Sequence, residues 1–158
     1  MFRVLTALLI LSLMFQPIQE NVSVLDCKTE VHVLNSAVRV EMELLIKCLK
    51  GEVSVSGVIL FLSPDEIENL EVRVNDVAAE FVVFPLGNES LIQYVLSPPM
   101  VKGEFRTVKI SFVSNSLTSK VGKTWSLFFT VLLPSNASTI NVWIYLPESC
   151  ALKSSCLE

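Results

Sequence analysis

Apolar and polar side chains alternate with a period of two over residues 30–47. Most of the polar positions carry a charge, and the longest apolar run between them is Val38, Val40, Met42, Leu44 and Ile46. Because successive side chains of a β-strand point to opposite faces of the sheet, this pattern predicts strands with one buried face and one solvated face. Asn35-Ser36 interrupts the alternation and is a turn signal, so we expect a hairpin here.

Several further segments have the same character, and turn residues or prolines separate them. They are residues 53–62, 70–74, 79–84, 90–96, 104–113, 124–133 and 140–146. Asn75-Asp76 predicts a two-residue hairpin turn, and Ser97-Pro98-Pro99 is expected to end the strand before it. About nine short strands with turn signals roughly every 8–12 residues are typical of a β-sandwich. We therefore expect one all-β domain over residues 21–158, an antiparallel β-sandwich (immunoglobulin-like or related) of eight to nine strands.

Two of the connections carry signals of their own. Ser63, with Glu66 three residues later, has the spacing of a capping box, so this connection is either one helical turn or an ordinary loop. Residues 114–123 predict the polar loop of a hairpin, with Gly122 at its bend. The triplet Gly122-Lys123-Thr124 also ends a phosphate-binding loop, but that motif needs a glycine where Leu117 stands and a helix, not a strand, after it. We therefore expect no nucleotide and no other cofactor.

Residues 1–20 differ from the rest of the chain. A single cation, Arg3, precedes an apolar run from Val4 to Phe15, which Gln16-Pro17 ends. As a helix this run would be about 18 Å long, which is short of the roughly 30 Å hydrocarbon core of a bilayer. The segment is therefore predicted to be an apolar helix that acts as a signal peptide or a short membrane anchor, with a buried N-terminal helix as the alternative. Membrane contact is expected through this segment alone.

Sequons and cysteines agree with export. The chain has three Asn-x-Ser sequons, at Asn21, Asn88 and Asn136, which are candidate glycosylation sites. It has four cysteines, Cys27, Cys48, Cys150 and Cys156, an even number that is typical of disulfides in an oxidising compartment. Strand parity places Cys27 and Cys48 on the buried face near the open end of the first hairpin. This favours a Cys27–Cys48 disulfide, which leaves Cys150 to pair with Cys156.

Charged and nucleophilic residues form no catalytic signature. The net charge of −4 without a basic block argues against nucleic-acid binding. His32, the only histidine, lies on the solvated face of its strand; Asp26 and Asp76 could complete a triad, but no Gly-x-Ser-x-Gly motif supplies the serine. A zinc site from His32 and its two neighbouring cysteines matches no standard ligand spacing. We therefore predict no catalytic residue, no metal site and no enzyme.

Trp143 and Tyr145 are two residues apart and therefore share one face of the last predicted strand. Packing in the core explains such a pair most simply, because the strand is very apolar. If the pair is exposed, the rings form a surface that could bind a sugar or a protein.

Residues 104–155 carry a sequence pattern that is also found in a known protein family. An alternating strand is followed by Ser116-Leu117-Thr118-Ser119-Lys120, then Gly122 and Trp125, an aromatic-rich strand, and a closing V-x-x-x-L-P-E from Val142 to Glu148. This resembles the extracytoplasmic β-sandwich at the N-terminus of archaeal membrane proteins, some of which carry a C-terminal winged helix. The resemblance implies an outer sensor or interaction domain tethered by a transmembrane helix. This chain stops at Glu158, before any such helix.

Three functions follow from these patterns. The first is an exported, non-enzymatic β-sandwich that binds a protein or glycan partner or has a structural role at the cell surface. The second, implied by the resemblance, is the extracytoplasmic sensory part of a membrane-bound regulator, cut off before its transmembrane helix. The third is a secreted carbohydrate-binding or carbohydrate-active protein that uses Trp143 and Tyr145.

Overall fold

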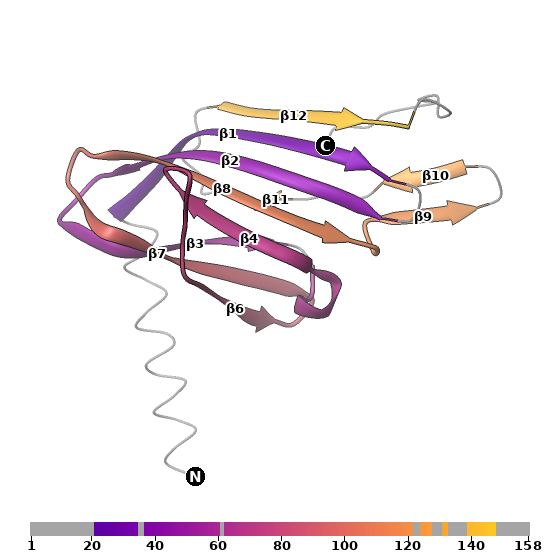
Figure 1. Cartoon of the computed structure of the whole chain (residues 1–158), viewed down its shortest axis with the longest axis horizontal. Coiled ribbons are helices and arrows are strands. Elements are labelled where there is room, and N and C mark those ends of the chain that lie inside the picture. Colours follow the sequence, from indigo (N-terminus) through magenta and orange to yellow (C-terminus); the bar gives the residue numbers. More distant parts are fainter. Residues whose placement is uncertain are drawn as a thin grey trace, which may run out of the picture.

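The computed structural model describes residues 21–34, 37–60, 62–121, 124–127, 131–132 and 139–147. The six-stranded sheet has the order β12 (Thr139–Tyr145), β1 (Val22–Val33), β2 (Val38–Cys48), β8 (Phe105–Ser114), β4 (Glu68–Val74) and β5 (Val77–Ala78). The four-stranded sheet has the order β11 (Val131–Leu132), β3 (Glu52–Leu60), β7 (Glu89–Val101) and β6 (Phe81–Leu86). A separate hairpin, β9 (Thr118–Val121) with β10 (Thr124–Leu127), projects from one end (Figure 1). The described residues are thus all-β and lie mainly in two sheets.

The two sheets enclose one hydrophobic core. In β2, every second residue from Val38 to Cys48 is buried, as the alternation predicts. From the other sheet, Leu60, Ile92, Tyr94 and Leu96 are at most 1% exposed and belong to the same cluster. The core therefore lies between the layers, and the outer face of each sheet is left for other contacts.

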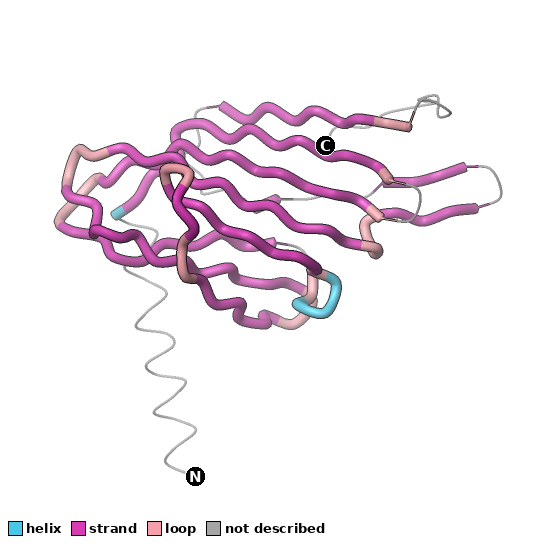
Figure 2. Tube along the Cα trace, viewed as in Figure 1, coloured by secondary structure: helices cyan, strands magenta, loops and turns pink. Residues whose placement is uncertain are grey.

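The structure also confirms the turn predicted at Asn75-Asp76 and the capping box predicted at Ser63. Asn75 and Asp76 form the two-residue turn between β4 and β5, with φ angles of 49° and 65° that suit these residue types. The connection after Ser63 is a single helical turn, η1 (Pro64–Glu66), in which the Ser63 N–H donates to Glu66 Oε2 at 2.9 Å. Figure 2 marks this turn among the strands and loops. Within the described ranges, no helix has the length and apolar character needed to cross a membrane.

Several predicted details of the fold are wrong. The sheets contain one parallel pair, β1 with β12, so the arrangement is not purely antiparallel, and the described part of the chain has 12 strands, not eight or nine. Pro98-Pro99 does not end the strand before it, because β7 continues to Val101 beside β3. Residues 114–123 are not one loop, because β9 lies within them and pairs with β10. The N-terminal apolar segment and Gly122 lie outside the described residues.

Candidate ligand-binding face

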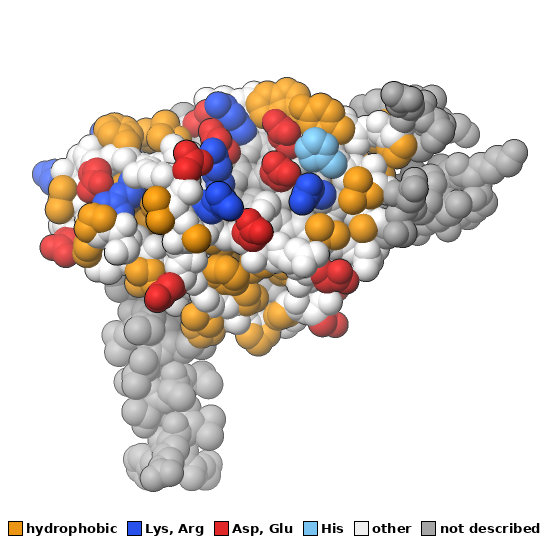
Figure 3. All heavy atoms as spheres, viewed as in Figure 1, with side chains coloured by type: hydrophobic (Ala, Val, Ile, Leu, Met, Phe, Trp, Pro, Cys, Tyr) orange, Lys and Arg blue, Asp and Glu red, His pale blue; other side chains and the backbone are white. Residues whose placement is uncertain are grey.

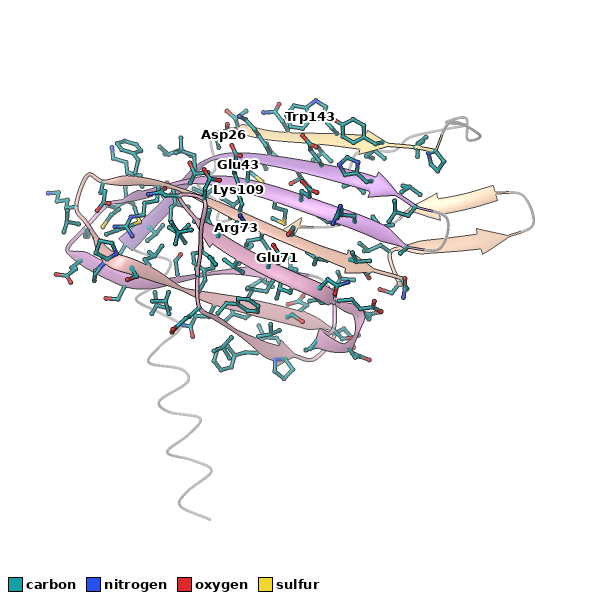
Figure 4. The ribbon with its side chains drawn as sticks, viewed as in Figure 1. Asp26, Glu43, Glu71, Arg73, Lys109 and Trp143 are labelled. Atoms are coloured by element: carbon teal, nitrogen blue, oxygen red, sulfur yellow. The ribbon has the colours of Figure 1, made fainter. Side chains whose placement is uncertain are left out.

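The outer face of the six-stranded sheet is a ladder of paired charges. Glu43 on β2 lies between Lys28 on β1 and Lys109 on β8, with N···O distances of 3.9 Å and 3.8 Å. Lys109 also donates to Asp76 Oδ1 at 2.6 Å. This hydrogen bond raises the pKa of Lys109 and lowers the pKa of Asp76, so both stay charged at neutral pH. Figure 4 shows Glu43 and Lys109 in one line across the strands.

The next row of the same face is acidic. Glu30 lies opposite Glu41 in the register of β1 and β2, and Ser111 separates Glu41 from Glu71. Basic side chains on neighbouring positions partly offset this row, at 3.8 Å for Arg39 with Glu41 and for Arg73 with Glu71. Because these pairs are exposed, they stabilise the fold little, and their charges remain available to a ligand.

Aromatic rings lie at the edge-strand end of the acidic row and of the row after it, whereas Asn141 ends the row of Lys28 and Glu43. Trp143 lies opposite Glu30, and Tyr145 lies opposite His32 in the parallel pairing of β12 with β1. The rings of Tyr145 and His32 stack with centroids 4.5 Å apart and an angle of 7° between their planes. Trp143 is 42% exposed and Tyr145 is 47% exposed, so the interpretation of this pair as core packing is wrong. We call Trp143, Tyr145, His32 and Glu30 the edge platform; Figure 3 shows apolar surface beside the histidine, next to the band of charges.

The edge platform lacks the arrangement of a catalytic triad. His32 Nε2 lies 3.4 Å from Glu30 Oε2, an ion-pair contact when the imidazole is protonated. Asp26 lies six residues away along β1, which is about 20 Å in a strand, and Asp76 is engaged by Lys109. Neither aspartate is placed to orient this imidazole.

Four carboxyl groups of the described residues have pKa values that are shifted from their usual value, and all four are lowered. Hydrogen bonds lower the pKa of Asp65, Glu66, Asp76 and Glu104, for Glu104 chiefly through the Val101 N–H. A general acid at neutral pH needs a raised carboxyl pKa, as burial in an apolar site gives. Among the described residues, no three His, Cys, Asp or Glu side chains are grouped so that they could hold a metal ion.

The predicted Cys27–Cys48 disulfide is wrong for this fold. Both side chains are buried and face the core, as parity predicts, but both are free thiols. Cys27 lies opposite Leu44 and Cys48 lies opposite Val22, because the pairing of Val33 with Val38 beside the turn sets the register of the two strands. The two cysteines are therefore about 13 Å apart along the sheet, roughly twice the Cα separation that a disulfide spans. Cys150 and Cys156 lie outside the described residues.

Peptide mapping checks this correction. Non-reducing digestion is expected to give no Cys27–Cys48 linked peptide. In the native protein both thiols should resist alkylation, because they are buried and because burial raises the pKa of Cys27. The same reagent in strong denaturant is the control, and it should label both residues. A linked Cys27–Cys48 peptide from native protein would contradict the register of β1 and β2.

The three sequons have different positions. Asn88 is exposed in the two-residue turn between β6 and β7, which agrees with the turn predicted there. Asn21 is partly exposed at the start of β1, where its carbonyl accepts the Leu49 N–H at 2.7 Å. Asn136 lies outside the described residues. Their glycosylation stays a prediction.

Sequence reasoning missed a buried cation. Arg106 is 4% exposed on the core-facing side of β8, where alternation predicts an apolar residue. Its guanidinium donates to Glu104 Oε1 at 2.8 Å and 2.9 Å and to the carbonyls of Pro98 and Pro99. The arginine therefore ties the proline segment of β7 to β8. The only sequence signal was its parity, which places Arg106 on the same face of the strand as Val108, Ile110 and Phe112.

A hollow on the four-stranded sheet is the other candidate binding site. It has a volume of about 460 Å³ and is lined by residues of β3, β5–β6 and β7, among them Val55, Val82, Gln93 and Val95. Among the described residues that line it, Glu80 is the only charged one. These residues are mainly apolar and, unlike those of the edge platform, include no aromatic ring that stacks on a polar group, so we take the edge platform as the candidate site.

Comparisons with known proteins give no family. No protein-family model matches the chain, and no curated protein matches it. Among solved structures, an M1 zinc metallopeptidase from Deinococcus radiodurans aligns with a TM-score of 0.48 and 13% identity over 63% of this chain and 22% of that one. Native yeast LTA4 hydrolase aligns with a TM-score of 0.49 and 16% identity over 61% of this chain and 15% of that one. The chain thus spans less than a quarter of the length of either protein. The resemblance to archaeal membrane proteins stays a prediction.

Proposed function

We propose that this chain is an exported, non-enzymatic β-sandwich domain that binds a protein or glycan partner through the edge platform. The observation that carries this proposal is the exposure of Trp143 and Tyr145 beside paired charges. Exposed aromatic rings contribute large contact area at low conformational entropy, and aromatic residues are enriched where binding energy concentrates. The charge ladder next to them would orient a partner by its own charges and hydrogen-bonding groups.

Sequence features support export. They are the apolar N-terminal segment and the Asn88 sequon, which lies in an exposed turn. The proposal as a non-enzyme is overturned if the purified protein turns over a substrate in a hydrolase panel and one Glu→Gln change abolishes that turnover.

A carbohydrate partner is the second candidate. A sugar ring stacks its C–H face on an aromatic ring while its hydroxyl groups bond to neighbouring polar side chains, and Glu30 and Asn141 flank Trp143 in the register. The alternative of a sensory domain of a membrane regulator rests on the sequence resemblance. Reading the genomic DNA beyond codon 158 tests it, because that role requires an apolar segment of about 20 residues in frame.

Trp143→Ala tests the edge platform on a glycan array. If a glycan is the partner, we expect the wild-type protein to bind a defined subset of glycans and the variant to bind them at least about 10-fold more weakly, as loss of a central aromatic contact does. Phe105→Ala, which removes an exposed aromatic ring from β8, is the matched control and should keep full affinity. Glycan binding that is insensitive to Trp143→Ala would exclude this site.

A further inference from the structure

Among the described residues, strand β12 forms one long edge of the six-stranded sheet with no strand paired to its outer side. It is the outermost strand on its side, and among the described residues it pairs with β1 alone (Figure 1). The other edge of this sheet is β5, which has two residues. A free strand edge exposes a row of backbone N–H and C=O groups that can pair with another chain.

The sequence of β12 lacks the residue types that usually protect a free edge. Its sequence, TINVWIY, contains no charge, no proline and no glycine. Natural proteins discourage pairing at free edges with charged residues, prolines, bulges or very short strands. All seven residues are uncharged and all but Asn141 have high β-propensity, which favours the addition of a further strand.

The core-facing side of β12 is also uncovered. Ile140 and Ile144 are 57% and 52% exposed, although Cys27 and Val31, opposite them on β1, are at most 1% exposed. Val142 is 48% exposed between them. The cover that buries the inner face of the sheet therefore ends at β1, and three β-branched side chains lie exposed beyond it.

We propose that β12 pairs antiparallel with β12 of a second copy of this chain, across a two-fold axis at Val142. Such an interface is isologous: if one residue of the first copy contacts another residue of the second copy, the reverse contact is also made. In this register Val142 faces Val142, Ile140 faces Ile144, and Asn141 faces Trp143. The strand is self-complementary because its inner side is wholly β-branched and apolar, and no like charges oppose each other.

The exposed apolar area on the inner side of β12 suits a weak, concentration-dependent dimer. Ile140, Val142 and Ile144 lie on this side and are 48–57% exposed, whereas Trp143 and Tyr145 lie on the outer side and stay exposed when the two sheets join. The three inner side chains expose roughly 300 Å² per copy, so two copies present about 600 Å², which is the size of a weak, transient contact. Backbone hydrogen bonds between the two strands would add to this burial.

The inference goes beyond the proposed binding role. It joins two six-stranded sheets into one continuous sheet and brings both copies of Trp143 close to the two-fold axis. The edge platforms then form one surface that presents two sites to a partner, which increases avidity without any new contact.

Charge-swap variants at Val142 test the proposal. The wild-type protein is expected to show twice the chain's mass in concentration-dependent analytical ultracentrifugation. Val142→Lys and Val142→Glu should each be monomeric, because like charges then meet at the axis. Mixing the two variants should restore the dimer, since the opposite charges now face each other. Val77→Lys, at the other edge of the sheet and 69% exposed, is the matched control and should stay dimeric.

Each other outcome counts against the proposal. A wild-type protein that is monomeric at all concentrations overturns it and leaves a strand of a different protein as the occupant of this edge. A dimer that survives Val142→Lys, or that Val77→Lys disrupts, places the interface elsewhere. Monomeric variants that stay apart after mixing overturn the register at Val142. Circular dichroism of each variant separates these outcomes from unfolding, and glycan binding by a monomer would leave the proposed function standing.

Discussion

Phe112→Ala is expected to lower the free energy of unfolding by about 3–5 kcal/mol. Phe112 is 1% exposed on β8, in the middle of the six-stranded sheet, where it lies opposite Val40 on β2. Truncation removes a ring from the core between the sheets and leaves a cavity that the neighbouring strands can fill only in part. Urea unfolding followed by far-UV circular dichroism measures the change as a lower midpoint.

The same strand supplies the control for this measurement. Phe105 is 50% exposed on β8, and its ring lies 5.1 Å from Lys47 Nζ. Phe105→Ala should therefore cost less than about 1 kcal/mol. If Phe112→Ala does not fold, Phe112→Leu replaces it and should show a smaller loss. Equal losses at positions 112 and 105 would contradict the assignment of Phe112 to the core.

Arg106→Met is expected to lower the free energy of unfolding by about 2–4 kcal/mol, although methionine keeps much of the apolar volume. The substitution removes the donors that serve the carbonyls of Pro98 and Pro99 and the carboxylate of Glu104. Arg73→Met is the matched control, because Arg73 is exposed and lies 3.8 Å from Glu71. That variant should change the stability by less than about 0.5 kcal/mol. Similar losses in both variants would show that the buried network does not hold β7 to β8.

The pH dependence of stability gives this prediction a second readout. Hydrogen bonds from the Val101 N–H and from Arg106 hold the pKa of Glu104 below its usual value of 4.5. A carboxyl group with a lowered folded pKa stabilises the protein above its unfolded pKa, and that stabilisation is lost as the pH falls through the folded pKa. Wild-type protein should therefore lose more stability below pH 4.5 than Arg106→Met. An identical acid dependence in the two proteins would exclude the Arg106 contribution.

Local pattern was enough to predict several strands, although not β9 or the full length of β7. The alternation of residues 38–48 fixes which side chains of β2 are buried, because that choice depends only on the two-residue period. The turn at Asn75-Asp76 could be predicted for the same reason, since its residue types suit positive φ angles within the turn itself. These features need no knowledge of distant partners.

Features that depend on distant partners were not predicted. The continuation of β7 through Pro98-Pro99 depends on hydrogen bonds from Arg106, which belongs to another strand and another sheet. The alternation of residues along one strand contains no information about such contacts.

The candidate site was predicted in part. That Trp143 and Tyr145 share a face follows from their spacing, and the structure places them on one strand with that parity. Their exposure could not be deduced, because an apolar edge strand and an apolar core strand have the same composition. Tyr145 stacks on His32, which is far away in the sequence, so no local pattern could predict this contact.

The parallel pairing of β1 with β12 also determines the order in which the domain can be completed. Asp26 and Thr139, which begin this pairing, are roughly 110 residues apart in the chain. During synthesis β1 is made early, and its outer edge has no strand to pair with until almost the whole domain has been translated. Closing so long a loop is slow compared with forming hairpins such as β4–β5. The nascent chain therefore presents an open edge during this interval, and β12 closes the sheet last.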